Sequence, residues 1–229
     1  MKQYVIIVAG GKGLRMDSDL PKQFILLDKK PVLMHTLERF YEWNASAEFI
    51  LVLPKEHQEH WKTLCTGLHC KIPHTIADGG ETRFQSVQNG LALVEHPSLV
   101  AVHDGVRPFV SIDVIANCFE KAKRYEAVIP VIPVTDSIRA MNATGSFSPA
   151  DREKFCLVQT PQVFHSTLLH KAYEQAPSNQ YTDDASVVEA LEVVGIHLVE
   201  GNRENIKITT PFDLLVARSI LRTIKTDYS

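Results

Sequence analysis

The chain of 229 residues has no long hydrophobic run. None of its apolar stretches approaches the roughly 20 residues that a membrane-spanning helix requires. The apolar run that follows Met1 is also too short for a signal peptide that ends in a cleavage site. We therefore expect a cytoplasmic protein that has no membrane partner.

Paired cysteines are missing as well. Cys65, Cys70, Cys118 and Cys156 form no C-x-x-C motif, and a reducing compartment would keep them as thiols. Histidines and cysteines do gather between His57 and Cys70, but their spacing matches no common zinc motif. We expect this stretch to form a surface helix and not a zinc site.

A strong charge of either sign is absent too. The net charge is −3, from 24 basic and 27 acidic residues. This balance gives no reason to expect a nucleic-acid partner, so an anionic ligand would need cations that are gathered locally. With 45% hydrophobic residues the chain is long enough to bury a full core, which favours one domain over residues 1–229.

Two common phosphate-binding motifs are absent from the glycine-rich turn near the N-terminus. The turn follows the apolar run Val5–Ala9 and contains Gly10, Gly11 and Gly13. It lacks the Lys-Ser/Thr pair of a P-loop, and the last glycine of a Rossmann fingerprint would fall on Met16. Neither a P-loop NTPase nor an ordinary dehydrogenase is favoured.

The residues that the turn does contain suit a polyphosphate. Glycines let backbone N–H groups approach an anion closely. Arg15 and Lys22 add a planar fork and a point charge, both of which bind phosphate. The alternative is a plain glycine turn with a solvated arginine. We favour the nucleotide site.

The rest of the chain alternates between short β-branched runs and segments with helical spacing. This pattern predicts a doubly wound, mostly parallel, Rossmann-like α/β sheet whose ligands lie at the carboxyl ends of the strands. The predicted strands are 4–9, 48–53, 72–77, 99–103, 127–132 and 196–200, and the predicted helices are 32–43, 56–64, 82–94, 111–125, 166–175, 183–192 and 211–225.

The segment 133–164 breaks this alternation. It carries polar, glycine and proline residues, and short β-type pieces at 137–141 and 155–159, without helical spacing. We expect a protruding β-arm that mediates dimerisation.

Two polar clusters follow predicted strands. In the first, Gly79 and Gly80 precede a helix that has Ser86 in its first turns. This cluster either binds a base or a phosphate, or is simply a helix start that Thr82 caps.

The second cluster contains His103 and Asp104. A carboxylate beside bound phosphates is a suitable Mg²⁺ ligand, whereas the alternative is an ion pair from Asp104 to Arg107 that shapes the loop. We favour the metal role for Asp104 and a core position for His103. Lys207 lies in an extended stretch before the last helix, where a lone lysine is usually a solvated surface charge.

Seven motifs in order make the chain resemble the 2-C-methyl-D-erythritol 4-phosphate cytidylyltransferase family over essentially its whole length. They are AGGKGLRM with PKQF, DGGETR with Ser86, HDGVRP, PVTDSIR, DR before VQTPQVF, TDDAS, and VEGNRENIKITTP. The resemblance implies that CTP and a phosphorylated polyol give a cytidine diphosphate polyol and pyrophosphate, with Mg²⁺ or another divalent cation.

The resemblance also implies roles for individual residues. The catalytic residues would be Arg15, Lys22, Lys207 and Arg152. The nucleotide would bind at Ala9, Gly10, Gly11, Gly13, Gly79, Gly80, Glu81, Ser86 and Asp104, and Asp104 would also serve the metal. The polyol phosphate would bind at Arg107, Thr135, Arg152, Thr160 and Thr182. Because the family's arm reaches across a homodimer, Thr135 and Arg152 would complete the partner's site.

Three alternatives remain open. A ribitol 5-phosphate cytidylyltransferase shares the fold and many motifs, although Asp151-Arg152 ahead of VQTPQVF favours methylerythritol phosphate. A sugar-phosphate nucleotidyltransferase that uses another NTP is a second alternative. A nucleotide-binding regulatory module without turnover is the third, and the presence of Lys22 and Lys207 argues against it.

Overall fold

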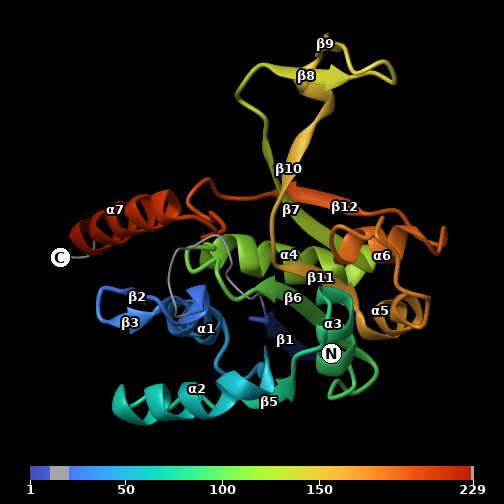
Figure 1. Ribbon diagram of the computed structural model, residues 1–229. Helices are drawn as coiled ribbons and strands as arrows, with labels where there is room; N and C mark the ends of the chain where they lie inside the picture. The colour runs from blue at the N-terminus through green and yellow to red at the C-terminus, as the bar shows by residue number, and fades with distance from the viewer. Residues whose placement is uncertain (11–20, 228–229) are drawn as a thin grey trace.

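The computed structural model describes residues 1–10 and 21–227 and centres on one eight-stranded sheet (Figure 1). Its strands are β1 (Lys2–Val8), β4 (Glu48–Leu53), β5 (Thr75–Asp78), β6 (Ser98–Asp104), β7 (Ala127–Pro133), β10 (Cys156–Val158), β11 (Gln162–His165) and β12 (His197–Glu200). The strand order is β10-β7-β11-β6-β1-β4-β5, and β12 pairs with β7.

Most strand pairs are parallel. Strand β1 pairs in parallel with both β4 and β6, β4 with β5, and β12 with β7, whereas β10 and β11 run antiparallel to their neighbours. This arrangement confirms the predicted fold class. The parallel strands end at the same edge of the sheet, where ligands of open α/β folds bind.

Helices cover both faces of the sheet. Helices α1 (Val32–Trp43), α2 (Lys55–Gly67) and α4 (Ile112–Tyr125) share a buried cluster with Val5 and Ile7 of β1. Helices α3 (Arg83–Leu91), α5 (Ser166–Tyr173) and α6 (Asp184–Glu189) share another with Tyr4 and Ile6. Successive side chains of β1 thus point to opposite faces, as a strand buried on both sides requires.

A smaller cluster attaches the C-terminal helix to the body. Helix α7 (Pro211–Asp227) contributes Leu214, the hairpin β2 (Leu26–Leu27) and β3 (Lys30–Pro31) contributes Leu27, and Ile208 lies between them. This packing fixes the loop that carries Lys207. Among the described helices, none is both long and apolar enough to cross a membrane.

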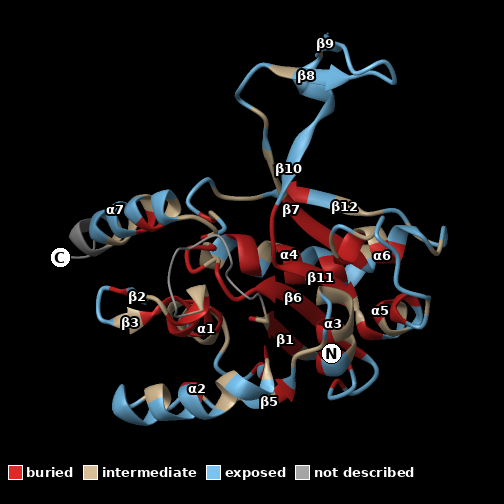
Figure 2. Ribbon diagram, in the orientation of Figure 1, coloured by how far each residue is buried: buried red, intermediate tan, exposed pale blue. Residues whose placement is uncertain are grey.

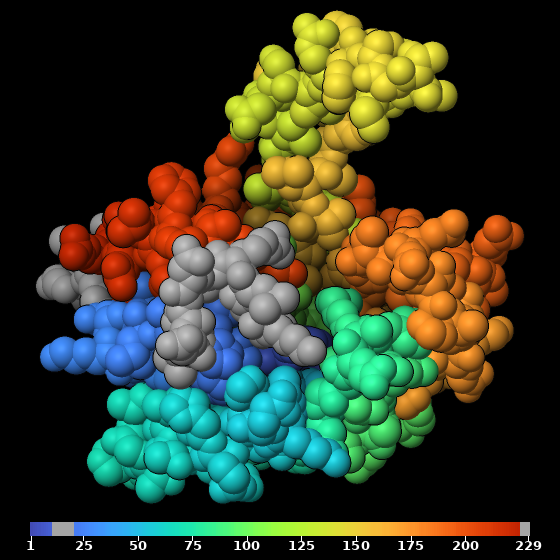
Figure 3. Space-filling model, viewed as in Figure 1, coloured from blue at the N-terminus to red at the C-terminus, as the bar shows by residue number. Residues whose placement is uncertain are grey.

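The arm projects from the sheet (Figures 1 and 3) and is largely exposed (Figure 2). It contains β8 (Ile138–Met141), β9 (Phe147–Ala150) and the 3-10 helix η2 (Arg152–Lys154). The predicted segment 133–164 is too long at its C-terminal side. Strand β11 is buried and pairs with β6 and β7, so it belongs to the central sheet.

Candidate active site

A cavity of about 850 Å³ lies at the edge where β1, β5 and β6 end, and its size is that of a small-molecule site. Nine predicted site residues line it: Ala9, Gly10, Lys22, Gly79, Gly80, Glu81, Ser86, Asp104 and Lys207. Gly11, Gly13 and Arg15 lie outside the described residues. The sheet thus gathers residues that are up to 198 positions apart (Ala9 to Lys207).

Strand register explains why Asp104 lies beside Val8, at the end of β1. Val8 and Asp104 are parallel-strand partners at the ends of β1 and β6, and the Gly105 N–H donates to the Val8 carbonyl at 2.9 Å. A Cβ at Gly105 would lie only 2.9 Å from the Ala9 Cβ. A glycine is therefore needed for the two strand ends to approach this closely.

Asp104 is surrounded by cations. Its Oδ2 lies 3.0 Å from Lys207 Nζ and 3.1 Å from Arg107 Nε, while its Oδ1 lies 3.9 Å from Arg83 Nε. Burial alone raises the pKa of Asp104, but Lys207, Arg83 and Arg107 together hold it well below its ordinary value. Asp104 is therefore ionised, and the ion pair with Arg107, which was the alternative to the favoured metal role, is present.

The loop before α7 is held against the end of β6. Arg107 Nη1 donates to the Asn205 carbonyl at 2.8 Å, and the Ile208 N–H donates to the Val106 carbonyl at 3.0 Å. These bonds place Lys207 on Asp104. Lys207 therefore lines the cavity and pairs with Asp104, while its side chain stays 41% exposed.

His103 is a buried core residue, as predicted. Because the Arg107 carbonyl can only accept, His103 Nε2 donates to it at 3.0 Å, and Nδ1 accepts from the Thr160 hydroxyl at 2.9 Å. The same hydroxyl accepts from the Asp104 N–H at 3.2 Å. Burial lowers the pKa of His103 to about 4, so the ring is neutral near pH 7.

Helix α3 starts beneath the cavity. The Thr82 side chain accepts from the Gln85 N–H at 3.1 Å, so the predicted helix cap is present. Ser86 Oγ accepts from the Gly80 N–H at 3.0 Å and donates to the Thr82 carbonyl at 2.9 Å. The Ser86 hydroxyl therefore already donates its hydrogen within the protein, so it can only accept a hydrogen bond from a ligand.

None of the five predicted polyol-binding residues is among the described residues that line this cavity. Arg152 Nη1 donates to the Thr135 carbonyl at 2.6 Å, and both residues are exposed on the arm. Thr182 is exposed before α6, and Thr160 is buried behind Asp104. The structure therefore pairs Thr135 with Arg152, but neither is among the described residues that line the cavity of their own chain.

Gln23, Lys55 and Arg83 are among the other residues that line the cavity, and the sequence analysis gave them no role. Gln23 Nε2 donates to the Ala9 carbonyl at 2.9 Å and so fixes the start of the glycine-rich turn. Lys55 lies two residues after the end of β4. The rule that ligands bind at the carboxyl ends of parallel strands could therefore have indicated it. Arg83 stands inside the DGGETR motif, but its partner, Asp184, is 101 residues away.

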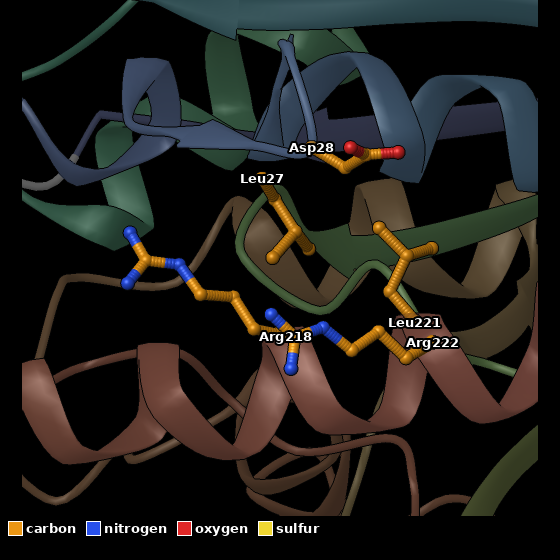
Figure 4. A pocket seen from close by; sticks show the side chains of 5 residues that line it. All are labelled: Leu27, Asp28, Arg218, Leu221 and Arg222. Carbon is orange, nitrogen blue, oxygen red and sulfur yellow. The ribbon is translucent and has the colours of Figure 1, made fainter.

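A second cavity of about 380 Å³ lies between the β2–β3 hairpin and α7. Figure 4 shows Arg218, Leu221 and Arg222 extending from α7 toward Leu27 and Asp28. It shares no described lining residue with the first cavity, so we assign it no part in the site.

A model of the 2-C-methyl-D-erythritol 4-phosphate cytidylyltransferase family matches residues 3–223. The chain belongs to this family. A cytidylyltransferase of that name from Bacteroides thetaiotaomicron is 59% identical over 221 residues, which cover 96% of this chain and 100% of the relative. One from Syntrophus aciditrophicus is 38% identical over 231 residues and covers 96% of each chain.

Solved structures of family members share the fold. The crystal structure of 4-diphosphocytidyl-2C-methyl-D-erythritol synthase from Anaerococcus prevotii matches with a TM-score of 0.84 at 29% identity, over 96% of each chain. The 2-C-methyl-D-erythritol 4-phosphate cytidylyltransferase of Thermus thermophilus matches with a TM-score of 0.79 at 33% identity, over 97% of this chain and 100% of that one.

Proposed function

We propose that the chain transfers the cytidylyl group of CTP to 2-C-methyl-D-erythritol 4-phosphate and releases pyrophosphate. The observation that carries the proposal is the cavity in which Lys22, Lys207 and Asp104 meet the glycine-rich backbone of Gly10 and Gly80. Family membership over residues 3–223 supports the same activity.

The cavity has a polarity that suits cytosine. Ser86 Oγ can only accept a hydrogen bond from a ligand. The Gly79 N–H already donates to the Leu53 carbonyl, and the Gly80 N–H already donates to Ser86 Oγ. Of these three residues, only acceptor atoms remain for a base. The exocyclic amino group of cytosine is a donor, whereas the O4 of uracil is an acceptor and would leave a buried acceptor unpaired.

The reaction needs alignment and charge neutralisation more than covalent help from the protein. A phosphate oxygen of the polyol phosphate bonds to the α-phosphorus, the bond from that phosphorus to the α,β-bridging oxygen breaks, and pyrophosphate leaves. Lys22 and Lys207, with Arg15, would stabilise the charge. The attacking phosphate is already ionised near pH 7, so no general base is required.

The residues at Asp104 fit one divalent cation. Lys207 and Arg107 bind Asp104 Oδ2, whereas the 3.9 Å contact with Arg83 is the only one that Oδ1 makes with a cation among the described residues. In the described part of the chain no three His, Cys, Asp or Glu side chains gather, so phosphate oxygens would supply the remaining ligands, as Mg²⁺ commonly accepts. When bound, Mg²⁺ or another divalent cation neutralises triphosphate charge.

We place the polyol phosphate between two chains. The arm exposes Met141 by 67%, Phe147 by 60% and Leu157 by 53%, and exposed apolar side chains gathered on a projection are typical of a protein interface. A partner arm in a homodimer would bring Thr135 and Arg152 to the cavity, beside Arg107, Thr160 and Thr182.

The location of the protein in the cytoplasm also remains a prediction.

A pyrophosphate-release assay tests the proposal. CTP, UTP, ATP and GTP are each paired with 2-C-methyl-D-erythritol 4-phosphate and with ribitol 5-phosphate. We expect release only with CTP and the methylerythritol substrate. Faster release with ribitol 5-phosphate, or with another nucleotide, would replace the proposal with the corresponding alternative, and binding of CTP without any release would favour a regulatory module.

A further inference from the structure

An ion pair with a fully buried carboxylate and a partly exposed guanidinium joins the first residue of α3 to the first residue of α6. Arg83 Nη1 and Nη2 bond to Asp184 Oδ1 and Oδ2 at 2.8 and 2.7 Å. The Asp184 side chain is 0% exposed, and Tyr173 Oη donates to its Oδ1 at 2.5 Å. Three donors therefore hold one carboxylate, which is the condition under which a buried charge is tolerated.

Arg83 stays charged beside this carboxylate. Burial alone lowers the pKa of Arg83, but Asp184 raises it above its ordinary value. Burial and Asp184 together raise the pKa of Tyr173, so its hydroxyl remains a donor. The two hydrogen bonds from the Arg83 fork therefore hold it on Asp184.

Arg83 also reaches the nucleotide cavity. It lines that cavity, and its Nε lies 3.9 Å from Asp104 Oδ1, too far for a hydrogen bond. The other oxygen of Asp104 already takes Lys207 and Arg107. Within residues 1–10 and 21–227, Oδ1 is therefore the oxygen of Asp104 that takes no hydrogen bond from a cation, and Arg83 is the nearest cation to it.

We propose that Asp184 is a positioning residue for nucleotide binding: it holds the Arg83 fork away from Asp104 and so keeps Oδ1 open. This inference rests on the proposed function of the cavity. Without the Asp184 charge, Asp104 is the nearest carboxylate to Arg83 among the described residues, and a shift of about 1 Å would bring Arg83 Nε within hydrogen-bond distance of Asp104 Oδ1. CTP would then have to displace the guanidinium before Asp104 could serve it.

Asp184→Asn tests this, because asparagine keeps the size of the side chain and removes its charge. We expect the KM for CTP to rise by roughly 10-fold, the ratio for one charge-assisted hydrogen bond, with kcat lowered much less. The double variant Arg83→Gln/Asp184→Asn removes the freed guanidinium and should return the KM toward the wild-type value. A role in stability alone cannot produce that rescue.

Two controls keep the test decisive. Tyr173→Phe removes a donor to the same carboxylate but leaves the ion pair. Because Arg83 stays bound to Asp184, the KM of this variant for CTP should stay within about twofold of wild type. If Asp184→Asn does not fold, Arg83→Gln alone decides: a KM near wild type supports the proposal, and a KM raised 10-fold makes Arg83 a direct ligand contact and overturns it.

Calorimetry with CTP alone separates the two proposals. Absence of CTP binding by the wild-type protein would overturn the proposed function itself. Equal CTP affinity of the wild type and of Asp184→Asn, or a double variant no better than the single one, would overturn only the role of Asp184.

Discussion

Gly80 lies where the chain passes from β5 into α3, and it has no room for a side chain. A Cβ at this position would lie 2.3 Å from the Gln85 Cβ and 3.0 Å from the Ser86 N. Carbon atoms in contact prefer about 3.5–4.0 Å, so the start of α3 would have to move by more than about 1 Å in Gly80→Ala. Ser86 would move with it.

The magnitude follows from that displacement. Overpacking of this kind costs roughly 1–3 kcal/mol of folding stability, and a misplacement of about 1 Å in a site can cost on the order of 100-fold in rate. We expect kcat/KM for CTP to fall by roughly 10- to 100-fold in Gly80→Ala. Steady-state pyrophosphate release and thermal unfolding measure the two effects.

Gly67→Ala is the matched control, because a Cβ at the end of α2 would meet nothing within 4 Å. It should leave both kcat/KM and Tm near the wild-type values. If Gly80→Ala were as active toward CTP as Gly67→Ala while folded, the contact of α3 with the base would not exist and the cavity would need another ligand.

The remaining predictions concern the same cavity. Lys22→Ala should lower kcat by on the order of 100-fold while changing the KM for CTP much less, because its charge matters most as the α-phosphate reacts; a raised KM at normal kcat would assign it to substrate binding. UTP should be disfavoured in kcat/KM by roughly 5- to 150-fold, the ratio for 1–3 kcal/mol of an unpaired acceptor, and equal values would remove the cytosine assignment. Mixed dimers of Lys22→Ala and Arg152→Ala, each inactive alone, should regain roughly a quarter of wild-type activity, since random mixing leaves one intact site in half of the dimers; heterodimers without activity would reject a shared site.

Regular, two-sided burial made much of the fold predictable. The strand 48–53 and the helix 32–43 have the predicted limits, because both are continuous apolar or amphipathic segments between clear ends. The strand expected at 72–77 begins only at Thr75, since Pro73 has no N–H to donate to a sheet. The β2–β3 hairpin was missed because strands of two residues show no alternation.

The arm shows a different limit of sequence reasoning. The lack of helical spacing correctly indicated a non-helical segment, but the sequence did not show that Gln162–His165 belongs to the central sheet and not to the arm. These four residues are antiparallel in a mostly parallel sheet, and their burial comes from β6 and β7. Pairing across 60 or so positions leaves no local pattern.

Some residues of the site could likewise be predicted from the sequence, and others could not. Ala9, Gly79 and Asp104 follow strand ends, so the edge rule for parallel sheets was enough to bring them together. Asp184 and Thr160 could not be placed by that rule. Asp184 acts through Arg83, and Thr160 acts through His103 and the Asp104 N–H, and these contacts exist only once helices and strands far apart in sequence are packed.

Substitution of Lys207 tests most directly whether cytidylyl transfer takes place in this cavity. Pyrophosphate release from CTP and 2-C-methyl-D-erythritol 4-phosphate is compared for the wild type, Lys207→Ala and Lys62→Ala. Lys62 is a control because it pairs with Glu59 on the exposed surface of α2. We predict release that needs both substrates, is unchanged in Lys62→Ala and falls by on the order of 100-fold in Lys207→Ala. No release by the wild type, or full activity of Lys207→Ala, would contradict the account.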